Sequence, residues 1–131
     1  MTQRTYSSFI VLGDSFSEGM TDEIINGNYR GWADRVADEL SKHNPNFRYA
    51  NLAVRGKLIH QVVQDQIPAA LQLVESGSLV SFHAGANDVI RPNYNPEVTL
   101  PAYATAVRKL SNELQNSGAK LMLFTVQESA A

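Results

Sequence analysis

Short apolar runs alternate with segments of helical spacing along this chain. The first run, residues 9–12, is continuously apolar and stops at Gly13, which predicts a strand buried on both faces. Further on, Trp32, Val36 and Leu40 fall four positions apart, so they would share one face of a helix. The N-terminal third therefore predicts a strand followed by an amphipathic helix.

The rest of the chain continues this alternation. Further strands are predicted at residues 47–52, 79–84 and 120–126. Residues 58–74 have helical spacing, with a break expected near Pro68 because proline cannot donate a helix hydrogen bond.

One long helix is predicted between the third and fourth strands. Its apolar stripe consists of Leu100, Tyr103, Ala104, Val107, Leu110 and Leu114. Thr99 is the expected N-cap, Pro101 falls in the first turn and Gly118 is the expected C-cap. A loop rich in proline and asparagine, residues 92–96, precedes this helix.

This order of elements predicts an α/β domain with one parallel sheet and right-handed crossovers. No repeat, low-complexity tract or linker interrupts it, so residues 1–131 are predicted to form a single domain. In such sheets, ligands bind outside the carboxyl ends of the strands. The residues that follow each strand are therefore the candidates for chemistry.

Composition narrows the class of partner but not the reaction. The chain has 131 residues and a net charge of −2, with scattered lysines and arginines, so we expect no nucleic-acid partner and no membrane. The absence of cysteine excludes a disulfide framework and a thiol nucleophile. The N-terminal residues carry no secretory pattern, and no apolar run approaches a bilayer span, so a cytoplasmic location is expected.

A serine follows the first strand directly, in the motif Gly13-Asp14-Ser15. The turn would hold its hydroxyl at the mouth of the sheet, where backbone amides can face developing negative charge. The motif is not the nucleophile elbow of the α/β-hydrolases, because Ser17 stands where the second glycine belongs. Taken alone, such a motif is more often an ordinary cap of a turn or helix.

Glycine and asparagine follow the second and third strands. The Asn87 amide can donate to an oxyanion without carrying charge, and Gly85 permits close backbone approach. Gly56 could offer a bare backbone amide after the second strand. Each of these features alone is more often a plain turn. Together with Ser15, they would form a nucleophile with a three-donor oxyanion hole.

The three blocks in this order resemble the SGNH hydrolases, also called GDSL esterases and lipases. The resemblance rests on Gly13-Asp14-Ser15, Gly56 and Gly85-Ala86-Asn87-Asp88, and it extends through residues 30–34 and 51–56. It covers residues 12–126, nearly the whole chain. It implies a three-layer, flavodoxin-like parallel sheet with strand order 2-1-3-4.

The resemblance also implies a role for each residue. Ser15 would attack the carbonyl of a small-molecule ester, and its own N–H, that of Gly56 and the Asn87 amide would hold the oxyanion. Each such donor is typically worth about 3 kcal/mol of barrier. Asp14 would brace the turn, and Asp88 would fix the loop that aims Asn87. The chemistry needs no cofactor and no metal.

One block of the family does not occur in these residues. Members carry Asp-x-x-His near the C-terminus, with the histidine as general base and the aspartate orienting it. His43, His60 and His83 all precede Asn87, and none follows an aspartate by three positions. We expect His43 to be solvated and His83 to be a packed or hydrogen-bonded core residue, whereas His60 could approach the rim of the pocket.

The sequence therefore predicts a truncated domain, without the fifth strand and last helix of the family and inactive or strongly impaired as a catalyst. An exposed edge on its fourth strand would favour self-association or retention of a C-terminal fragment. An apolar rim of the pocket is expected from Tyr29, Trp32, Ile90 and Tyr94. The acyl chain and the alcohol of the substrate cannot be read from the sequence.

Two other functions fit the same residues. A non-catalytic pseudo-enzyme would use the pocket to hold an acyl or acetylated ligand, and an intact natural chain ending at Ala131 would favour it. A flavodoxin-like phosphate-binding domain would cradle phosphate with Gly13-Asp14-Ser15, although neither a P-loop nor Gly-x-Gly-x-x-Gly is present. An anion or flavin bound at the end of the first strand would favour that second alternative.

Overall fold

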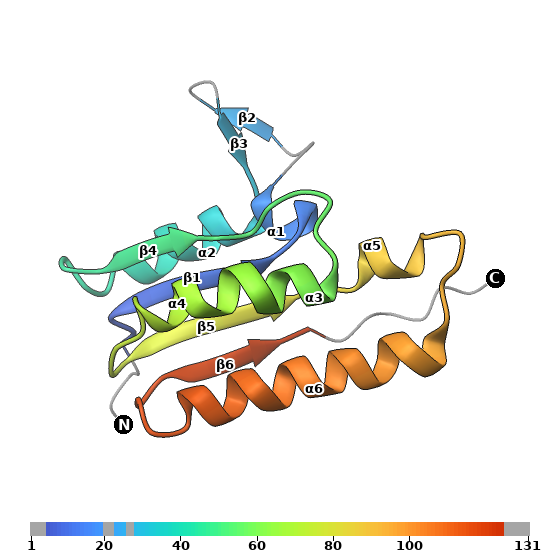
Figure 1. Ribbon diagram of the computed structural model, residues 1–131. Coiled ribbons are helices and arrows are strands. Elements are labelled where there is room, and N and C mark those ends of the chain that lie inside the picture. Colours follow the sequence, from blue (N-terminus) through green and yellow to red (C-terminus); the bar gives the residue numbers. More distant parts are fainter. Residues whose placement is uncertain (1–4, 20–22, 26–27, 125–131) are drawn as a thin grey trace.

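A four-stranded parallel sheet forms the centre of the protein (Figure 1). The structure, a computed structural model, describes residues 5–19, 23–25 and 28–124. The strands of the sheet are β1 (Ser8–Gly13), β4 (Arg48–Asn51), β5 (Ser78–His83) and β6 (Lys120–Leu123). Their spatial order is β4-β1-β5-β6, and all pairings are parallel. The predicted sheet and its 2-1-3-4 order are confirmed.

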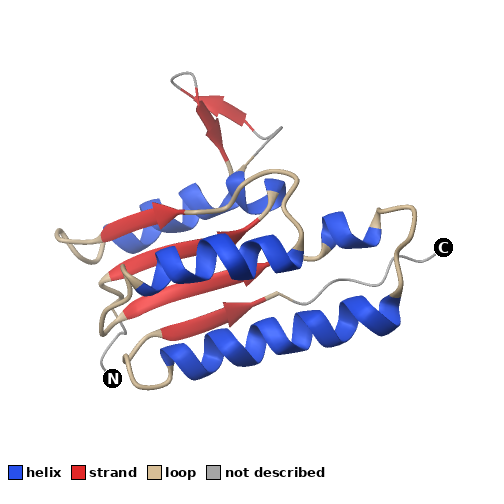
Figure 2. Cartoon of the chain, viewed as in Figure 1, coloured by secondary structure: helices blue, strands red, loops and turns tan. Residues whose placement is uncertain are grey.

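Helices cover both faces of this sheet (Figure 2). On one face lies α2 (Trp32–Ser41), close to β4 and β1. The other face carries α3 (Ile59–Gln61), the π-helical turn η1 (Val62–Gln66), α4 (Ile67–Leu71) and α6 (Pro96–Leu114). The arrangement has three layers, as the resemblance implied.

The apolar run of β1 supplies the core on both faces. Ile10 and Leu12 pack against the helices on the α6 side, whereas Phe9 and Val11 pack toward α2. All four are at most 2% exposed. A central strand of a parallel sheet is buried on both faces, and this explains why its sequence is continuously apolar rather than alternating. β1 is therefore an inner strand of the sheet, and Gly13 is its last residue.

The long helix begins earlier than the sequence predicted. Its N-cap is Asn95, whose side chain accepts the N–H of Glu97 at 3.0 Å, so the predicted cap at Thr99 is wrong. Pro96 occupies the first helical position, where its missing N–H costs nothing. The predicted loop of proline and asparagine is thus largely confirmed, because residues 92–95 precede the helix and only Pro96 belongs to it, whereas Pro101 lies inside the helix.

The irregularity expected near Pro68 is the π-helical turn η1, which ends at Gln66, just before α4 and its Pro68. One further boundary differs from expectation. At the other end of α6, Gln115 is the C-cap, and Gly118 follows with a φ of +81°. None of the helices in the described ranges is long and apolar enough to cross a membrane.

Four short elements were not predicted. They are α1 (Ser15–Glu18), the antiparallel pair β2 (Glu23–Ile25) and β3 (Asn28–Arg30), and α5 (Ala86–Val89). Segments of three or four residues are too short to produce a readable hydrophobic period. Two of them matter for function, because α1 follows β1 directly and α5 lies just beyond the end of β5. Both therefore lie at the carboxyl-end edge of the sheet.

Candidate active site

Ser15 is the first residue of α1, at the carboxyl end of the central strand β1. Asp14 caps this short helix, its Oδ1 accepting the Phe16 N–H at 3.2 Å. Gly13 approaches the neighbouring strand so closely that a Cβ there would lie 2.3 Å from the carbonyl oxygen of His83. Glycine is required at that position, and it lets the chain turn sharply enough to present Ser15.

Polar side chains hold this turn from both faces of the sheet. Gln66, 4% exposed, accepts the Gly13 N–H through Oε1 at 2.8 Å and donates through Nε2 to the Gly13 carbonyl at 2.9 Å. On the α2 side, Asn51 donates through Nδ2 to the carbonyl of Ser17 at 2.8 Å. The backbone on each side of Ser15 is therefore fixed. The sequence alone predicts no such role for Gln66 or Asn51.

Gly56 lies on the exposed loop between β4 and α3. Its φ is +76°, a conformation that favours glycine, and no atom would contact an added Cβ within 4 Å. In the described part of the chain, no hydrogen bond uses the N–H of Gly56 or that of Ser15. Within the described ranges, both backbone donors are thus free to bind a ligand.

Asn87 lies in α5 and reaches the Gly56 loop. Its Nδ2 donates to the carbonyl of Lys57, the residue after Gly56, at 2.9 Å. A side-chain amide carries two N–H donors, so this contact leaves one hydrogen for an oxyanion. The next residue, Asp88, also ties α5 to the segment after Gly56, because its Oδ1 accepts the Ile59 N–H at 3.0 Å.

The structure therefore brings the predicted residues to one edge of the sheet. Ser15 follows β1 and Gly56 follows β4, whereas Asn87 follows β5 and contacts the Gly56 loop. Gly85 is the N-cap of α5 with a φ of +117°, which sets the turn from β5 into that helix. A hydroxyl at this edge, with two backbone N–H groups that no described contact uses and a side-chain amide, is a set suited to acyl transfer.

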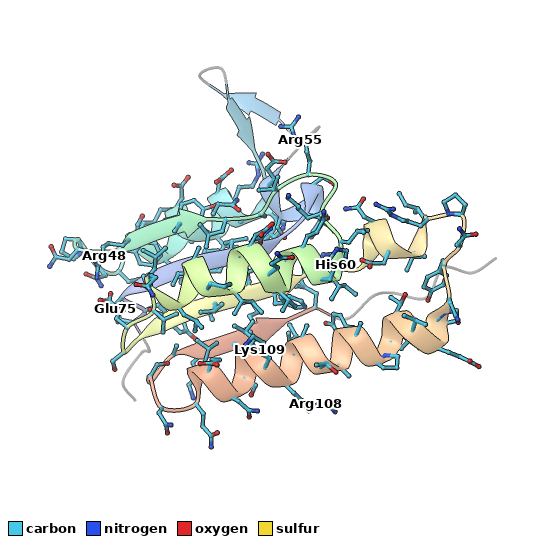
Figure 3. All side chains as sticks on the ribbon, in the orientation of Figure 1. Arg48, Arg55, His60, Glu75, Arg108 and Lys109 are labelled. Atoms are coloured by element: carbon cyan, nitrogen blue, oxygen red, sulfur yellow. The ribbon has the colours of Figure 1, made fainter. Side chains whose placement is uncertain are left out.

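The three histidines lie in different environments. His43 is exposed beyond the end of α2, and His60 is exposed on α3 (Figure 3). His83 is half-buried at the end of β5, with ring centroids 4.8 Å from Phe16 and 5.1 Å from Phe124. Its Nδ1 is buried and has no hydrogen-bond partner among the residues that the structure describes. Among the described residues, no histidine is hydrogen-bonded to Ser15.

Asp14, directly before Ser15, is almost fully buried, at 1% exposure. Burial raises the pKa of its carboxyl above the ordinary value, and the Phe16 N–H and His83 oppose this shift only in part. Its Oδ2 has no hydrogen-bond partner among the described groups. Ionised Asp14 therefore carries an incompletely compensated charge in the folded state.

We expect the Asp14→Asn variant to gain stability relative to the parent as pH rises. A raised folded-state pKa means that the fold favours the protonated carboxyl, which adds to the parent's free energy of unfolding at low pH. This contribution is fully present below the ordinary pKa of 3.8 and is lost as pH rises through the folded-state pKa. The amide oxygen of the substituted side chain can keep the cap to Phe16. Urea unfolding of both proteins from pH 3 to 7 measures the difference, and a stability gap that is constant with pH would contradict the account.

An apolar cavity of about 540 Å³ opens beside α5. It is lined by Ile59, His83, Ala84, Gly85, Ala86, Val89, Ile90, Tyr94, Thr99, Leu100, Tyr103 and Phe124. Of the expected apolar rim, Ile90 and Tyr94 line this cavity, whereas Trp32 packs against the rings of Phe16 and Phe124. The side chain of Tyr29 lies outside the described residues. No three His, Asp or Glu side chains in the described ranges gather as metal ligands.

Fold and motif order together define the class of SGNH hydrolases, with a parallel 2-1-3-4 sheet and the Gly-Asp-Ser, Gly and Asn blocks following successive strands. The model of the GDSL-like lipase/acylhydrolase family matches residues 11–130. The chain belongs to this family. No curated protein matches it by sequence.

Solved structures of similar fold agree with this assignment. TesA is 25% identical with a TM-score of 0.68, over 92% of this chain and 61% of that chain. Axe2-W215I, an acetyl xylan esterase from Geobacillus stearothermophilus, is 19% identical with a TM-score of 0.69, over 92% and 61%. A GDSL-like lipase from Bacteroides thetaiotaomicron is 20% identical with a TM-score of 0.55, over 89% and 47%. The chain thus spans less than two thirds of the length of each.

Proposed function

We propose that this domain hydrolyses carboxylic esters through an acyl-enzyme at Ser15. The observation that carries the proposal is the bond from Asn87 Nδ2 to the carbonyl of Lys57, which sets a side-chain amide beside Gly56 at the same sheet edge as Ser15. Membership of the GDSL-like lipase/acylhydrolase family supports it.

In the proposed reaction, Ser15 Oγ attacks the ester carbonyl and the carbonyl oxygen becomes an oxyanion. The N–H groups of Ser15 and Gly56 and the second hydrogen of Asn87 Nδ2 stabilise that oxyanion. Collapse of the intermediate expels the alcohol and leaves an acyl-serine, which water hydrolyses. Both steps require a base that accepts a proton, first from Ser15 and then from water. The same group returns the first proton to the leaving alcohol and the second to Ser15 Oγ as the carboxylic acid departs.

We propose that the base is the histidine of an Asp-x-x-His block, as in the family, and that residues 1–131 alone turn over slowly. His60 is exposed on α3, and His83 packs between two aromatic rings. Neither is hydrogen-bonded to Ser15 among the described contacts. Without a positioned base, Ser15 is an ordinary alcohol.

The cavity of about 540 Å³ supports an ester with an apolar acyl group as substrate. Aliphatic and aromatic side chains dominate its lining, including the exposed residues Ile90 and Leu100. Burying an acyl chain there would gain roughly 0.8 kcal/mol for each CH₂ group removed from water. His83 and Gly85, at the end of β5, connect the cavity to the strand end that bears Asn87.

A non-catalytic binding module is the second candidate, favoured by the lack of a described histidine bonded to Ser15. The two functions separate in one experiment on the extended chain, by which we mean residues 1–131 joined to a segment that carries Asp-x-x-His. The segment comes from the same gene where the gene continues past Ala131, and otherwise from a family member. Esterase function predicts that the extended chain hydrolyses p-nitrophenyl acetate and that Ser15→Ala abolishes this. A binding module predicts no turnover in either.

We also propose that residues 1–131 self-associate through β6. This strand is the last in the sheet order, so no described strand pairs with its outer edge. Its residues Lys120 and Leu123 are exposed, and Leu123 is a large apolar residue at 45% exposure. The predicted strand residues 125–126 lie outside the described ranges. An unpaired apolar edge is a template for strand pairing.

We expect sedimentation at micromolar concentration to show dimers or larger species of residues 1–131. Leu123→Lys should shift the population toward monomer, because charge on an edge strand opposes pairing. Leu73→Lys, which alters an exposed apolar residue just beyond α4, is the matched control and should leave association unchanged. A parent that sediments as a clean monomer would refute this proposal.

A further inference from the structure

Glu18 and Arg55 link α1, the short helix that begins with Ser15, to the loop that carries Gly56. Glu18 is the last residue of α1, and Arg55 directly precedes Gly56. Glu18 Oε2 accepts the backbone N–H of Arg55 at 3.0 Å and its Nε–H at 3.2 Å, while Oε1 accepts from Nη2 at 3.3 Å. We call these three contacts the Glu18–Arg55 clamp. Figure 3 shows Arg55 at the α1 end of the molecule.

The Glu18–Arg55 clamp is one of several contacts that hold the residues on both sides of Gly56, whereas Gly56 itself is not held. On one side of Gly56, the carbonyl of Lys57 accepts from Asn87. On the other side, the N–H of Val54 donates to the carbonyl of Gly13 at 3.2 Å, and the next residue is held by Glu18. Gly56 itself has open space around its Cα and no described hydrogen bond at its N–H.

The orientation of the Gly56 N–H depends on its two neighbours. That N–H belongs to the peptide between Arg55 and Gly56, whose plane is set by ψ of the former and φ of the latter. A glycine with a φ of +76° and free space has a broad choice of such planes. The contact of Glu18 with the Arg55 N–H holds the preceding peptide, between Val54 and Arg55, and the side-chain fork holds Arg55 from its side chain. Together they anchor the residue whose ψ sets that plane, which narrows the choice.

We infer that Glu18 is a positioning residue, which aims the Gly56 N–H at the oxyanion of the proposed ester hydrolysis through the Glu18–Arg55 clamp. The inference rests on that proposed function. Side-chain exposures of 53% for Arg55 and 28% for Glu18 mean that the ion pair contributes little to global stability. Its effect belongs instead to the geometry of the loop.

The first test measures the loop itself and needs no catalysis. In ¹⁵N relaxation of residues 1–131, the backbone order parameter of Gly56 should fall in Glu18→Ala from about 0.85, typical of rigid backbone, toward 0.6. Arg55→Ala should lower it less, because the backbone contact to Glu18 remains. An order parameter that is equal in parent and Glu18→Ala would overturn the inference.

The second test measures turnover in the extended chain. Complete loss of an oxyanion donor lowers kcat by about 10²–10³-fold, so a misaimed donor should cost less. We expect Glu18→Ala to lower kcat about 10- to 100-fold with KM changed less than about threefold, and Arg55→Ala to lower kcat less than about fivefold. Glu18→Gln, which keeps an acceptor for the Arg55 N–H, should recover part of the loss.

Arg48 and Glu75 provide the matched control. They form an exposed Arg–Glu pair at the opposite end of the sheet, with side-chain exposures of 71% and 36% (Figure 3). Glu75→Ala should leave kcat and the Gly56 order parameter unchanged. Glu75→Ala and Glu18→Ala should each shift the melting temperature by no more than about 4 °C. If kcat fell as much in Glu75→Ala as in Glu18→Ala, loss of any surface ion pair would lower kcat, and the positioning role of Glu18 would be refuted.

The two tests also separate this inference from the proposed function. If the extended chain does not hydrolyse esters but Gly56 loses order in Glu18→Ala, the proposed function fails and the clamp remains. If the extended chain hydrolyses esters through Ser15 and Glu18→Ala retains the parent kcat, the inference fails and the proposed function remains.

Discussion

The extended chain is expected to hydrolyse p-nitrophenyl acetate about 10⁴–10⁶-fold faster than residues 1–131 alone. The reason is the state of Ser15, whose hydroxyl becomes an effective nucleophile only when a base removes its proton during attack. The described structure offers Ser15 no hydrogen bond to a histidine. The oxyanion donors and the cavity alone would leave a small residual rate.

Initial rates over a range of ester concentration measure this difference. Ser15→Ala in the extended chain should fall to the level of residues 1–131, which shows that the gain passes through Ser15. Turnover of residues 1–131 at ordinary enzyme rates, about 1–10³ s⁻¹, and its loss in His60→Ala would contradict the account. The base would then be a histidine that the structure shows exposed on α3.

Replacement of Asn87 by alanine in the extended chain should lower kcat about 10²–10³-fold with little change in KM. The side-chain amide would donate to an oxyanion that exists only after attack, so its loss raises the barrier without weakening ground-state binding. The same change removes the bond from Asn87 Nδ2 to the carbonyl of Lys57, which loosens the Gly56 loop. Both consequences act in the same direction.

Two further variants sharpen this prediction. Asn87→Asp should be at least as slow as Asn87→Ala, because a carboxylate repels the oxyanion and cannot donate. Asn93→Ala changes an exposed asparagine in the loop after α5 and should leave kcat unchanged. A kcat of Asn87→Ala within about threefold of the parent would remove Asn87 from the oxyanion hole.

The sheet could be predicted from the sequence because its central strands follow simple physical rules. A strand buried on both faces is continuously apolar, and residues 9–12 show this pattern. The ends of β1 and β5 were located by Gly13 and Gly85, both of which have positive φ. The strand ends in turn indicated that Ser15 and Asn87 would share one edge of the sheet.

The long-range contacts that hold the site in place could not be predicted from the sequence. Gln66 is separated from Gly13 by 53 positions, and Glu18 from Arg55 by 37. A glutamine in a helical segment and an ion pair of distant residues carry no local pattern, so only the folded chain shows these contacts. The start of α6 was misplaced for a related reason, since Asn95 and Pro96 are compatible with a loop as well as with a helix cap.

The most direct test is a crystal structure of the extended chain after reaction with diethyl p-nitrophenyl phosphate. The account predicts a diethyl phosphoryl group on Ser15 Oγ, with its free oxygen about 2.7–3.1 Å from the backbone nitrogens of Ser15 and Gly56 and from Asn87 Nδ2. A phosphoryl group on another residue, or an oxygen that points away from Gly56 and Asn87, would contradict it.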